Sequence, residues 1–282
     1  MELSRPRRVI INFTKKCALN CEWCYVDFDK SRIDIDTLIR VIDRVHELGF
    51  ESITFGGGDP FQVRHLSLAI IQAKTLGLNV HVDTHGISLL ESDKNISLIN
   101  NYVDWLGLPL DGSTKETHDL MRGKKGHFDL VMQKLSWLKE TSTRIKINTI
   151  VTQVNKHEIS SLASLIKMIG PHRWSVYQYW PVGVAARASL SHNIQGAEFD
   201  AIVDHLDMFS LGKTVVEFNN SESRRNTYPI LNHEGKVTVH NEYPNNSYNY
   251  IGSIFDDNVA NQITTTSFGE RYQAVSRYKA IG

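Results

Sequence analysis

Short apolar runs that alternate with helix-like patterns constrain the fold of this chain more than any other feature. The runs are four to eight residues long and hold few polar positions, as expected for strands buried on both faces. They are Val9–Phe13, Ser52–Phe55, Asn79–Asp83, Val103–Leu110, Ile145–Thr152 and Trp174–Trp180. Because strands separated by helices need crossover connections, this order predicts a parallel sheet with right-handed crossovers.

The segment between the first two runs gives the clearest helix pattern. Its apolar residues recur three or four positions apart, at Leu38, Ile39, Ile42, Val45 and Leu48. We expect Asp36 to be its N-cap and Gly49 to follow its C-terminus. Further helices are expected over His65–Leu76, His127–Lys139, Lys156–Ile169 and Ala197–Phe209.

Six such β-then-α units predict an α/β fold, a partial (βα)6 barrel, with ligands at the C-terminal ends of its strands. We expect residues 1–185 to form this core and residues 186–282 a C-terminal extension that covers the substrate site within one compact unit. The extension has a candidate strand at Val215–Phe218, a hairpin from Tyr228–Leu231 and Lys236–His240, a loop at Asn241–Asn249 and a helix at Phe268–Ala280.

Charge and hydropathy give no sign of a nucleic acid or membrane partner. The formal net charge is +0, the first residues hold no signal-peptide core, and no run reaches the 18 or so apolar residues of a membrane span. We therefore expect a soluble, cytoplasmic protein with a small-molecule substrate.

The chain's three cysteines, Cys17, Cys21 and Cys24, lie within eight residues directly after the first expected strand. An odd number so closely spaced argues against a disulfide framework. Three thiolates can hold three irons of a four-iron cube and leave the fourth iron open to an amine and a carboxylate, both of which S-adenosylmethionine (SAM) carries. The alternative is a zinc site with one of the 12 histidines, although zinc ligands usually come from two separated stations.

The C-x3-C-x2-C spacing, followed by the aromatic Tyr25, resembles the radical SAM superfamily over residues 9 to about 180. The resemblance implies a partial (βα)6 barrel, a [4Fe–4S] cluster on the three cysteines, and SAM beside Tyr25.

Two glycine-containing segments resemble the SAM-binding stations of that superfamily. G-G-G-D-P at 56–60 resembles the G-G-E-P motif, which implies SAM contacts for Gly57, Gly58 and Asp59, although Asp59 replaces the usual Glu. T-H-G at 84–86 resembles the T-N-G station, which implies contacts for Thr84 and for His85, where Asn is usual.

The fourth and fifth strands add three further candidates for SAM binding. Asp111 ends the fourth strand, and Arg122 follows it closely. A guanidinium can hold the SAM carboxylate with two hydrogen bonds, so Arg122 is the candidate for that contact. Asn148 is polar within an apolar strand and is a candidate for the adenine or ribose.

The second half resembles the viperin-like branch of the superfamily. K-I-N-T at 146–149, R-W-S-V-Y-Q at 173–178, G-A-E-F at 196–199 and S-R-R-N-T-Y-P-I-L at 223–231 are similar to its K-I-N-S, R-W-K-V-F-Q, G-D-E-E-F and K-M-K-D-S-Y-L-I-L. The resemblance implies a nucleoside triphosphate substrate such as CTP, which loses its ribose 4′ hydrogen and its 3′ hydroxyl. The product, a 3′-deoxy-3′,4′-didehydro nucleotide, would serve antiviral defence.

The same resemblance implies roles for residues of this second half. Lys146, Arg173, Arg224 and Arg225 would hold the phosphates, Tyr228 would deliver the final hydrogen, and flavodoxin or ferredoxin would supply electrons. Ser175 stands where the branch has a phosphate-binding Lys, which would suit fewer phosphates, another nucleotide or a nucleotide sugar. Pro109 stands where the branch has a Ser near the SAM carboxylate.

Two other functions fit part of the pattern. A radical SAM decarboxylase or dehydrogenase acting on a nucleoside or nucleotide sugar would share the residues up to about 150. A zinc-stabilised binding module would need only the cysteines and a fourth ligand. A peptide-modifying enzyme with auxiliary clusters is disfavoured, because residues 25–282 hold no further Cys.

Overall fold

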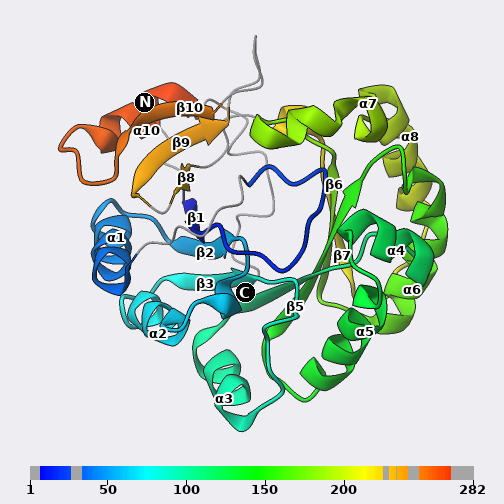
Figure 1. Cartoon of the computed structure of the whole chain (residues 1–282), viewed down its shortest axis with the longest axis horizontal. Helices are drawn as coiled ribbons and strands as arrows, with labels where there is room; N and C mark the ends of the chain where they lie inside the picture. The colour runs from blue at the N-terminus through cyan, green and yellow to red at the C-terminus, as the bar shows by residue number, and fades with distance from the viewer. Residues whose placement is uncertain (1–6, 27–33, 225–228, 233, 241–247, 268–282) are drawn as a thin grey trace.

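The computed structural model describes residues 7–26, 34–224, 229–232, 234–240 and 248–267, and their strands form a single sheet. The six expected strands lie side by side and parallel in chain order. They are β1 (Arg8–Thr14), β2 (Ser52–Gly57), β3 (Asn79–Asp83), β4 (Trp105–Pro109), β5 (Arg144–Val151) and β6 (Arg173–Gln178). The sheet curves with its helices on the outside (Figure 1), so the expected α/β partial barrel is confirmed.

The helices between these strands are α1 (Ile35–Glu47), α2 (Leu66–Thr75), α3 (Asp93–Tyr102), α4 (Lys115–Arg122), α5 (His127–Leu138) and α6 (Ile159–Ile169). The prediction that Asp36 caps α1 was wrong, because the side chain of Asp34 accepts the hydrogen bond from the Thr37 amide. Gly49 follows the helix with φ 80°, as expected. The sequence analysis missed α3 and α4 because their short, polar segments carry few apolar residues.

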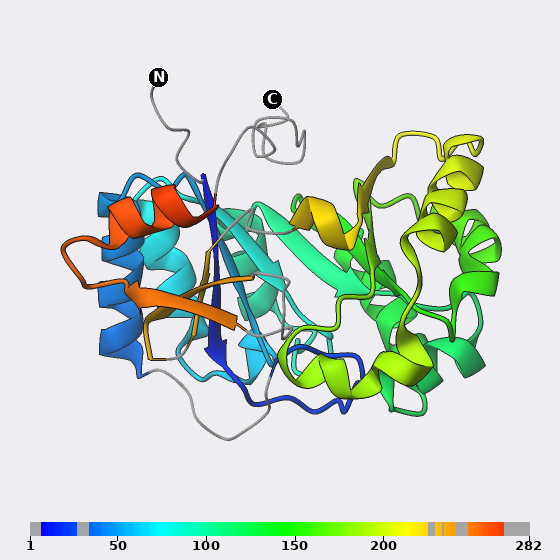
Figure 2. The same ribbon diagram turned by 90° about the horizontal axis from the view of Figure 1, so that it is seen from above.

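The C-terminal extension adds strands to both edges of the six-stranded core. Its elements are a 3-10 helix (Gly183–Ala188), α7 (Ser189–His192), α8 (Gly196–Asp207), β7 (Val215–Asn219), α9 (Ser221–Arg224), β8 (Ile230–Leu231), β9 (Lys236–His240), β10 (Tyr248–Ser253) and α10 (Val259–Ser267). β7 pairs with β6, whereas β8 pairs with β1 and forms the expected hairpin with β9. Figure 2 shows β9, β10 and α10 beside α1, far from α7 and α8.

Two details of the extension differ from the sequence analysis or lie beyond the description. β10 begins at Tyr248, so the last two positions of the expected loop at Asn241–Asn249 belong to a strand. The expected helix at Phe268–Ala280 lies outside the described residues. The division at residue 185 stays a prediction.

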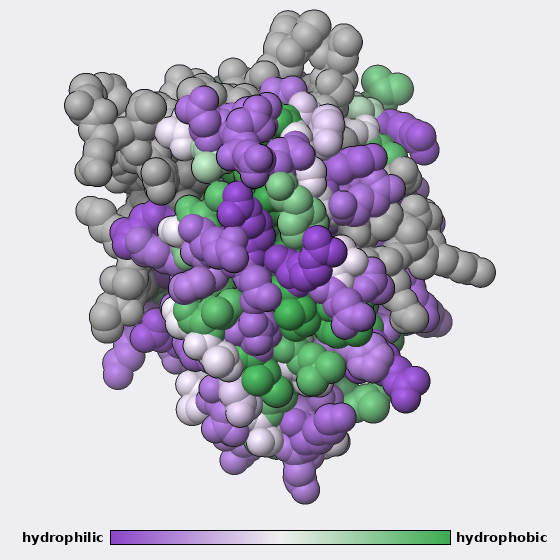
Figure 3. Space-filling model, turned by 90° about the vertical axis from the view of Figure 1, so that its left-hand side faces the viewer, coloured by the Kyte–Doolittle hydropathy of each residue, from purple (hydrophilic) through white to green (hydrophobic). Residues whose placement is uncertain are grey.

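The alternation of side chains along each strand separates an apolar outer layer from a polar interior. Phe55, Val82 and Leu108 point outward and are fully buried in the hydrophobic core under the helices. Their neighbours Thr54 and Asp83 face inward, toward the cavity described below. On the side shown in Figure 3, hydrophilic residues surround several smaller hydrophobic areas. Within the described residues, no helix is both long and apolar enough to span a bilayer.

Candidate active site

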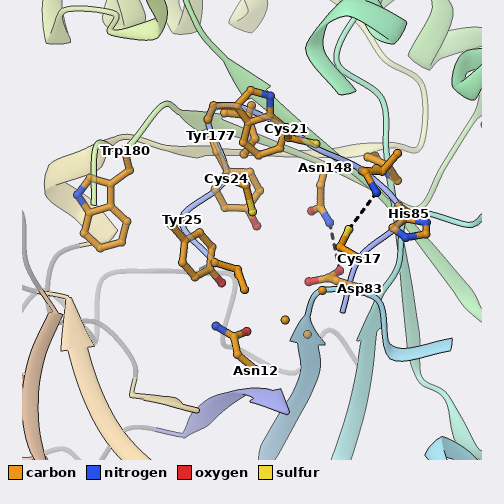
Figure 4. Close-up of a pocket in the computed structure, with 18 of the residues that line it drawn as sticks. Asn12, Cys17, Cys21, Cys24, Tyr25, Asp83, His85, Asn148, Tyr177 and Trp180 are labelled. Carbon is orange, nitrogen blue, oxygen red and sulfur yellow. Dashed lines mark hydrogen bonds between the residues drawn. The ribbon is translucent and has the colours of Figure 1, made fainter. Parts of the chain in front are cut away.

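A cavity opens at the C-terminal ends of the parallel strands, where the loop after β1 crosses the barrel (Figure 4). Most of the residues expected to bind SAM or the cluster line it. Those that do are Cys17, Cys21, Cys24, Tyr25, Gly57, Gly58, Thr84, His85, Arg122 and Asn148, together with Arg224 from the expected substrate set. The structure therefore brings these candidates together around one cavity, although several others lie elsewhere.

The cysteine loop is held by the C-terminal end of α4, about 100 residues later in the chain. The Cys21 thiol donates to the backbone carbonyl of Arg122 across 3.7 Å, and the indole N–H of Trp23 donates to the carbonyl of Met121 at 2.9 Å. The last carbonyls of a helix lack partners within it, so they are free to accept these bonds. The loop thus takes its position from an element that the sequence analysis missed.

The three thiols share one cavity and are protonated when no metal is near. Burial raises the pKa of Cys17 to about 11 and that of Cys24 to about 12, and it also raises the pKa of Cys21. Among the described residues, no three His, Cys, Asp or Glu side chains converge as the ligands of a single ion would. Thiols spread around one cavity suit a group with several irons, each of which takes one thiolate and displaces its proton.

The glycine segment supports the cysteine loop from the other side. Gly58 donates from its amide to the Thr14 carbonyl at 2.6 Å, and a Cβ at Gly58 would lie 1.9 Å from the Lys16 carbonyl oxygen. Gly57 has φ 107°, and its Cβ would lie 2.2 Å from the Thr14 carbonyl oxygen. The glycines are therefore required by close backbone packing as well as by any ligand.

Asp59 lies behind the cavity wall and positions His85. Asp59 is fully buried, its carboxylate lies 2.8 Å from Nδ1 of His85, and it accepts the Thr84 hydroxyl at 3.0 Å. His85 is also buried, and its Nε2 has no hydrogen-bond partner. The two departures from the superfamily pattern, Asp59 and His85, thus form a single unit, and His85 is the member that reaches the cavity.

Arg122 is fixed beside the cysteines by Asp111. Its Nε lies 2.5 Å from the fully buried Asp111 carboxylate, and its guanidinium stacks 4.7 Å from the centre of the Trp23 ring. Burial lowers the pKa of Arg122, but the Asp111 carboxylate and Cys21 outweigh this and raise it overall. Arg122 therefore offers a permanent positive charge to the cavity, whereas Asp111 supports it from behind.

Two buried histidines, His118 and His127, connect the backbone at Asp111 to the backbone at His85. The Asp111 amide donates to Nδ1 of His118 at 3.1 Å, Nε2 of His118 lies 2.8 Å from Nδ1 of His127, and Nε2 of His127 lies 2.9 Å from the His85 carbonyl oxygen. Because an amide can only donate, each ring must carry its proton on Nε2 and be neutral. Burial, followed by Arg122, lowers the pKa of His118 to about 2 and that of His127 to about 4.

We expect this histidine pair to make the fold sensitive to acid. Their pKa values are below those in the unfolded chain, so stability is complete above about pH 6.5 and falls as the unfolded state takes up protons. Each histidine should lower the free energy of unfolding by about 1.4 kcal/mol for each pH unit below that point. Urea unfolding at pH 7.5 and 5.5 measures the loss, and His127→Gln should reduce it. Equal losses in the variant and the parent protein would contradict the assignment.

The remaining candidates either do not line the cavity or lie outside the described residues. Lys146 is buried and pairs with Asp83 at 2.9 Å, and Arg173 is buried and pairs with Glu217 at 3.0 Å. Neither is among the described residues that line the cavity. Arg225 and Tyr228 lie outside the described residues.

The sequence analysis missed several residues that line the cavity. Asn12, Asp83, Tyr177 and Trp180 surround its open space in Figure 4. Asn12 is in register with the lining residue Gly56, and Asp83 lies on the inner face of β3, in register with Gly107. A polar residue at alternate positions of an apolar strand was the available signal.

Comparison with known proteins begins with the family whose pattern matches the chain. The model of the radical SAM superfamily matches residues 11–166, from β1 through most of α6. This chain belongs to the radical SAM superfamily. As a radical SAM enzyme it uses a [4Fe–4S] cluster together with SAM, and the three thiols that share one cavity fit that group.

Two relatives carry the name S-adenosylmethionine-dependent nucleotide dehydratase, which agrees with the expected viperin-like branch. The protein from Flammeovirga pacifica is 26% identical, with 94% of this chain and 91% of the relative covered. That from Lacinutrix mariniflava is 25% identical and covers 94% of this chain, which spans only 56% of its length. An AdoMet-dependent heme synthase from Nitratidesulfovibrio vulgaris is 26% identical, but the alignment covers only 68% of this chain and 53% of the relative.

Two solved structures of proteins with bound S-adenosylmethionine (AdoMet) share the fold. AnSMEcpe with bound AdoMet and a peptide has a TM-score of 0.71 at 14% identity, with 95% of this chain and 81% of that chain covered. Streptococcus suis SuiB bound to S-adenosylmethionine has a TM-score of 0.71 at 13% identity, with 96% and 68% covered.

Proposed function

We propose that this radical SAM enzyme is a dehydratase that acts on the ribose of a nucleotide, with nucleoside triphosphates such as CTP as the first candidates. The observation that carries the proposal is the extent of the likeness to nucleotide dehydratases, which covers 94% of the chain and includes the extension. That extension contributes Arg224 to the cavity wall. The proposal includes a cytoplasmic location, flavodoxin or ferredoxin as electron donor, and a role in antiviral defence.

We propose that Cys17, Cys21 and Cys24 hold the cluster, and that SAM binds against the adjoining wall. Tyr25, Gly57, Gly58, Thr84, His85, Arg122 and Asn148 would contact SAM, with Asp59 and Asp111 as the supports of His85 and Arg122. With an electron from the bound cluster, SAM supplies a 5′-deoxyadenosyl radical. The protein's task is to hold the ribose 4′ carbon within reach and to keep water out.

The proposed reaction removes the elements of water from the ribose. The 4′ hydrogen leaves as an atom, the 3′ hydroxyl leaves with a proton as water, and one electron completes the 3′,4′ double bond. The lining aromatics Tyr25, Tyr177 and Trp180 give the cavity apolar surface on which a base or ribose can pack.

Anaerobic incubation of the reconstituted enzyme with SAM, dithionite and each nucleoside and its mono-, di- and triphosphate in turn, followed by mass spectrometry, tests the proposal. We expect strong formation of 5′-deoxyadenosine with one nucleotide and a product lighter by one water. Slow 5′-deoxyadenosine formation with every nucleotide, and no dehydrated product, would reject it and direct the search to nucleotide sugars.

Tyr228 is proposed to supply the final electron and proton. Tyr228→Phe should still form 5′-deoxyadenosine, but the yield of dehydrated product should fall by about tenfold or more, because phenylalanine has no transferable O–H hydrogen. Tyr250→Phe is the matched control, since Tyr250 is 55% exposed on β10. An unchanged product yield in Tyr228→Phe would remove Tyr228 from the mechanism.

A further inference from the structure

The floor of the cavity is built from side chains on the inner faces of β1, β3 and β5. Asn12, Asp83 and Asn148 line it, and the Asn148 amide donates to the Asp83 carboxylate at 3.1 Å. The oxygen atoms of both asparagine side chains are buried and have no hydrogen-bond partner. The two asparagine oxygens are closed off from the cavity, so the Asp83 carboxylate, on a side chain that is 34% exposed, is the acceptor that the floor offers to a ligand.

Lys146 lies in register with Asp83, two strands away, and its charge is already paired. Its ammonium group reaches past Gly107 of β4 to the Asp83 carboxylate, 2.9 Å away. A side chain at Gly107 would prevent this, since its Cβ would lie 1.9 Å from an Asp83 oxygen. Lys146 is 4% exposed, and burial lowers its pKa although Asp83 opposes the shift. An anion in the cavity would meet the acidic member of this pair first, because Asp83 lines the cavity.

Arg173 is neutralised in the same way on the next strands. Its guanidinium pairs with Glu217 of β7 at 3.0 Å and stacks 4.3 Å from the centre of the Trp105 ring. The second oxygen of Glu217 accepts the Ser175 hydroxyl at 2.9 Å. Ser175 thus has a structural role of its own, because its hydroxyl holds the Glu217 carboxylate that pairs with Arg173.

We propose, on the basis of the function proposed above, that the substrate is a nucleoside or nucleoside monophosphate whose hydroxyl groups face this floor, rather than a nucleoside triphosphate anchored there. Phosphate oxygens only accept hydrogen bonds and carry negative charge, so they would be repelled by the Asp83 carboxylate. A ribose hydroxyl group can instead donate a hydrogen bond to that carboxylate. By this proposal, Asp83 and Glu217 determine how many phosphate groups the bound substrate carries.

Binding of a phosphate series to the cluster-loaded enzyme tests this inference. Cytidine, CMP, CDP and CTP, and the corresponding series for the other bases, are measured by anaerobic equilibrium dialysis in the presence of SAM, with 5′-deoxyadenosine formation as the second readout. We expect the nucleoside or monophosphate of one base to bind about tenfold or more tightly than its triphosphate. Tightest binding of a triphosphate would overturn the inference and leave the dehydratase proposal standing. If no member of any series binds, both are rejected.

Two variants examine the acids directly. Asp83→Asn and Glu217→Gln should each raise the affinity for CTP by about tenfold, because they release the charge of Lys146 or Arg173. Using both protects the test if one of them fails to fold. Asp129→Asn is the matched control, since it removes an acid from the exposed pair with Lys115. If both variants fold and their CTP affinity is unchanged, the claim that these acids neutralise Lys146 and Arg173 toward phosphate is wrong.

Discussion

A Cys21→Ala variant should bind little iron and sulfide after anaerobic reconstitution and should form 5′-deoxyadenosine at least about a hundredfold more slowly than the parent enzyme. Three thiolates leave a four-iron cube with one open iron, and the loss of a thiolate removes a ligand that water cannot replace in a buried loop. Cys21 is the most buried of the three ligand candidates and the one hydrogen-bonded to the end of α4. Iron and sulfide analysis, the visible absorption spectrum and 5′-deoxyadenosine formation measure the effect.

The hydrophobic contribution of Cys21 can be separated from its ligand role. Cys21→Ser keeps the size of the side chain and should lose the cluster as well, whereas Met208→Ala, at a position 76% exposed, should load iron normally. Circular dichroism confirms that the variants are folded. Normal iron content and full SAM cleavage in Cys21→Ala would remove Cys21 from the ligand set.

The second large effect is expected at Arg122. Arg122→Met should weaken SAM binding by about tenfold to a hundredfold, the range of a lost charge-assisted hydrogen bond. It should also destabilise the fold by about 3–5 kcal/mol, because Asp111 would remain buried without its partner. Equilibrium dialysis with labelled SAM measures the first effect and urea unfolding the second.

The double variant Asp111→Asn with Arg122→Met separates these two roles. It removes the uncompensated charge, so stability should return to within about 1–2 kcal/mol of the parent protein. SAM affinity should stay low, because the guanidinium is still absent. If the double variant also regains SAM affinity, Arg122 acts only as a structural partner of Asp111 and does not bind the carboxylate.

The sequence was sufficient to predict the parallel barrel core and the cysteine loop. Strands buried on both faces need continuous apolar runs, and helices with one buried face need apolar residues three or four positions apart, so these elements are visible in the order of residues. The three cysteines are close in sequence, and their spacing therefore survives without any knowledge of the fold. Polar, short elements such as α3 and α4 leave no such pattern, and they were missed.

Only the tertiary structure decided which charges face the cavity. Lys146 and Arg173 are cations in the sequence, and nothing local shows that Asp83 and Glu217, 63 and 44 positions away along the chain, neutralise them. The pairings depend on strand register, on the absence of a side chain at Gly107, and on the addition of β7 beside β6. The radical SAM family could be predicted because its cysteine pattern is local in the sequence, whereas the proposed form of the substrate depends on charges that only the folded barrel brings together.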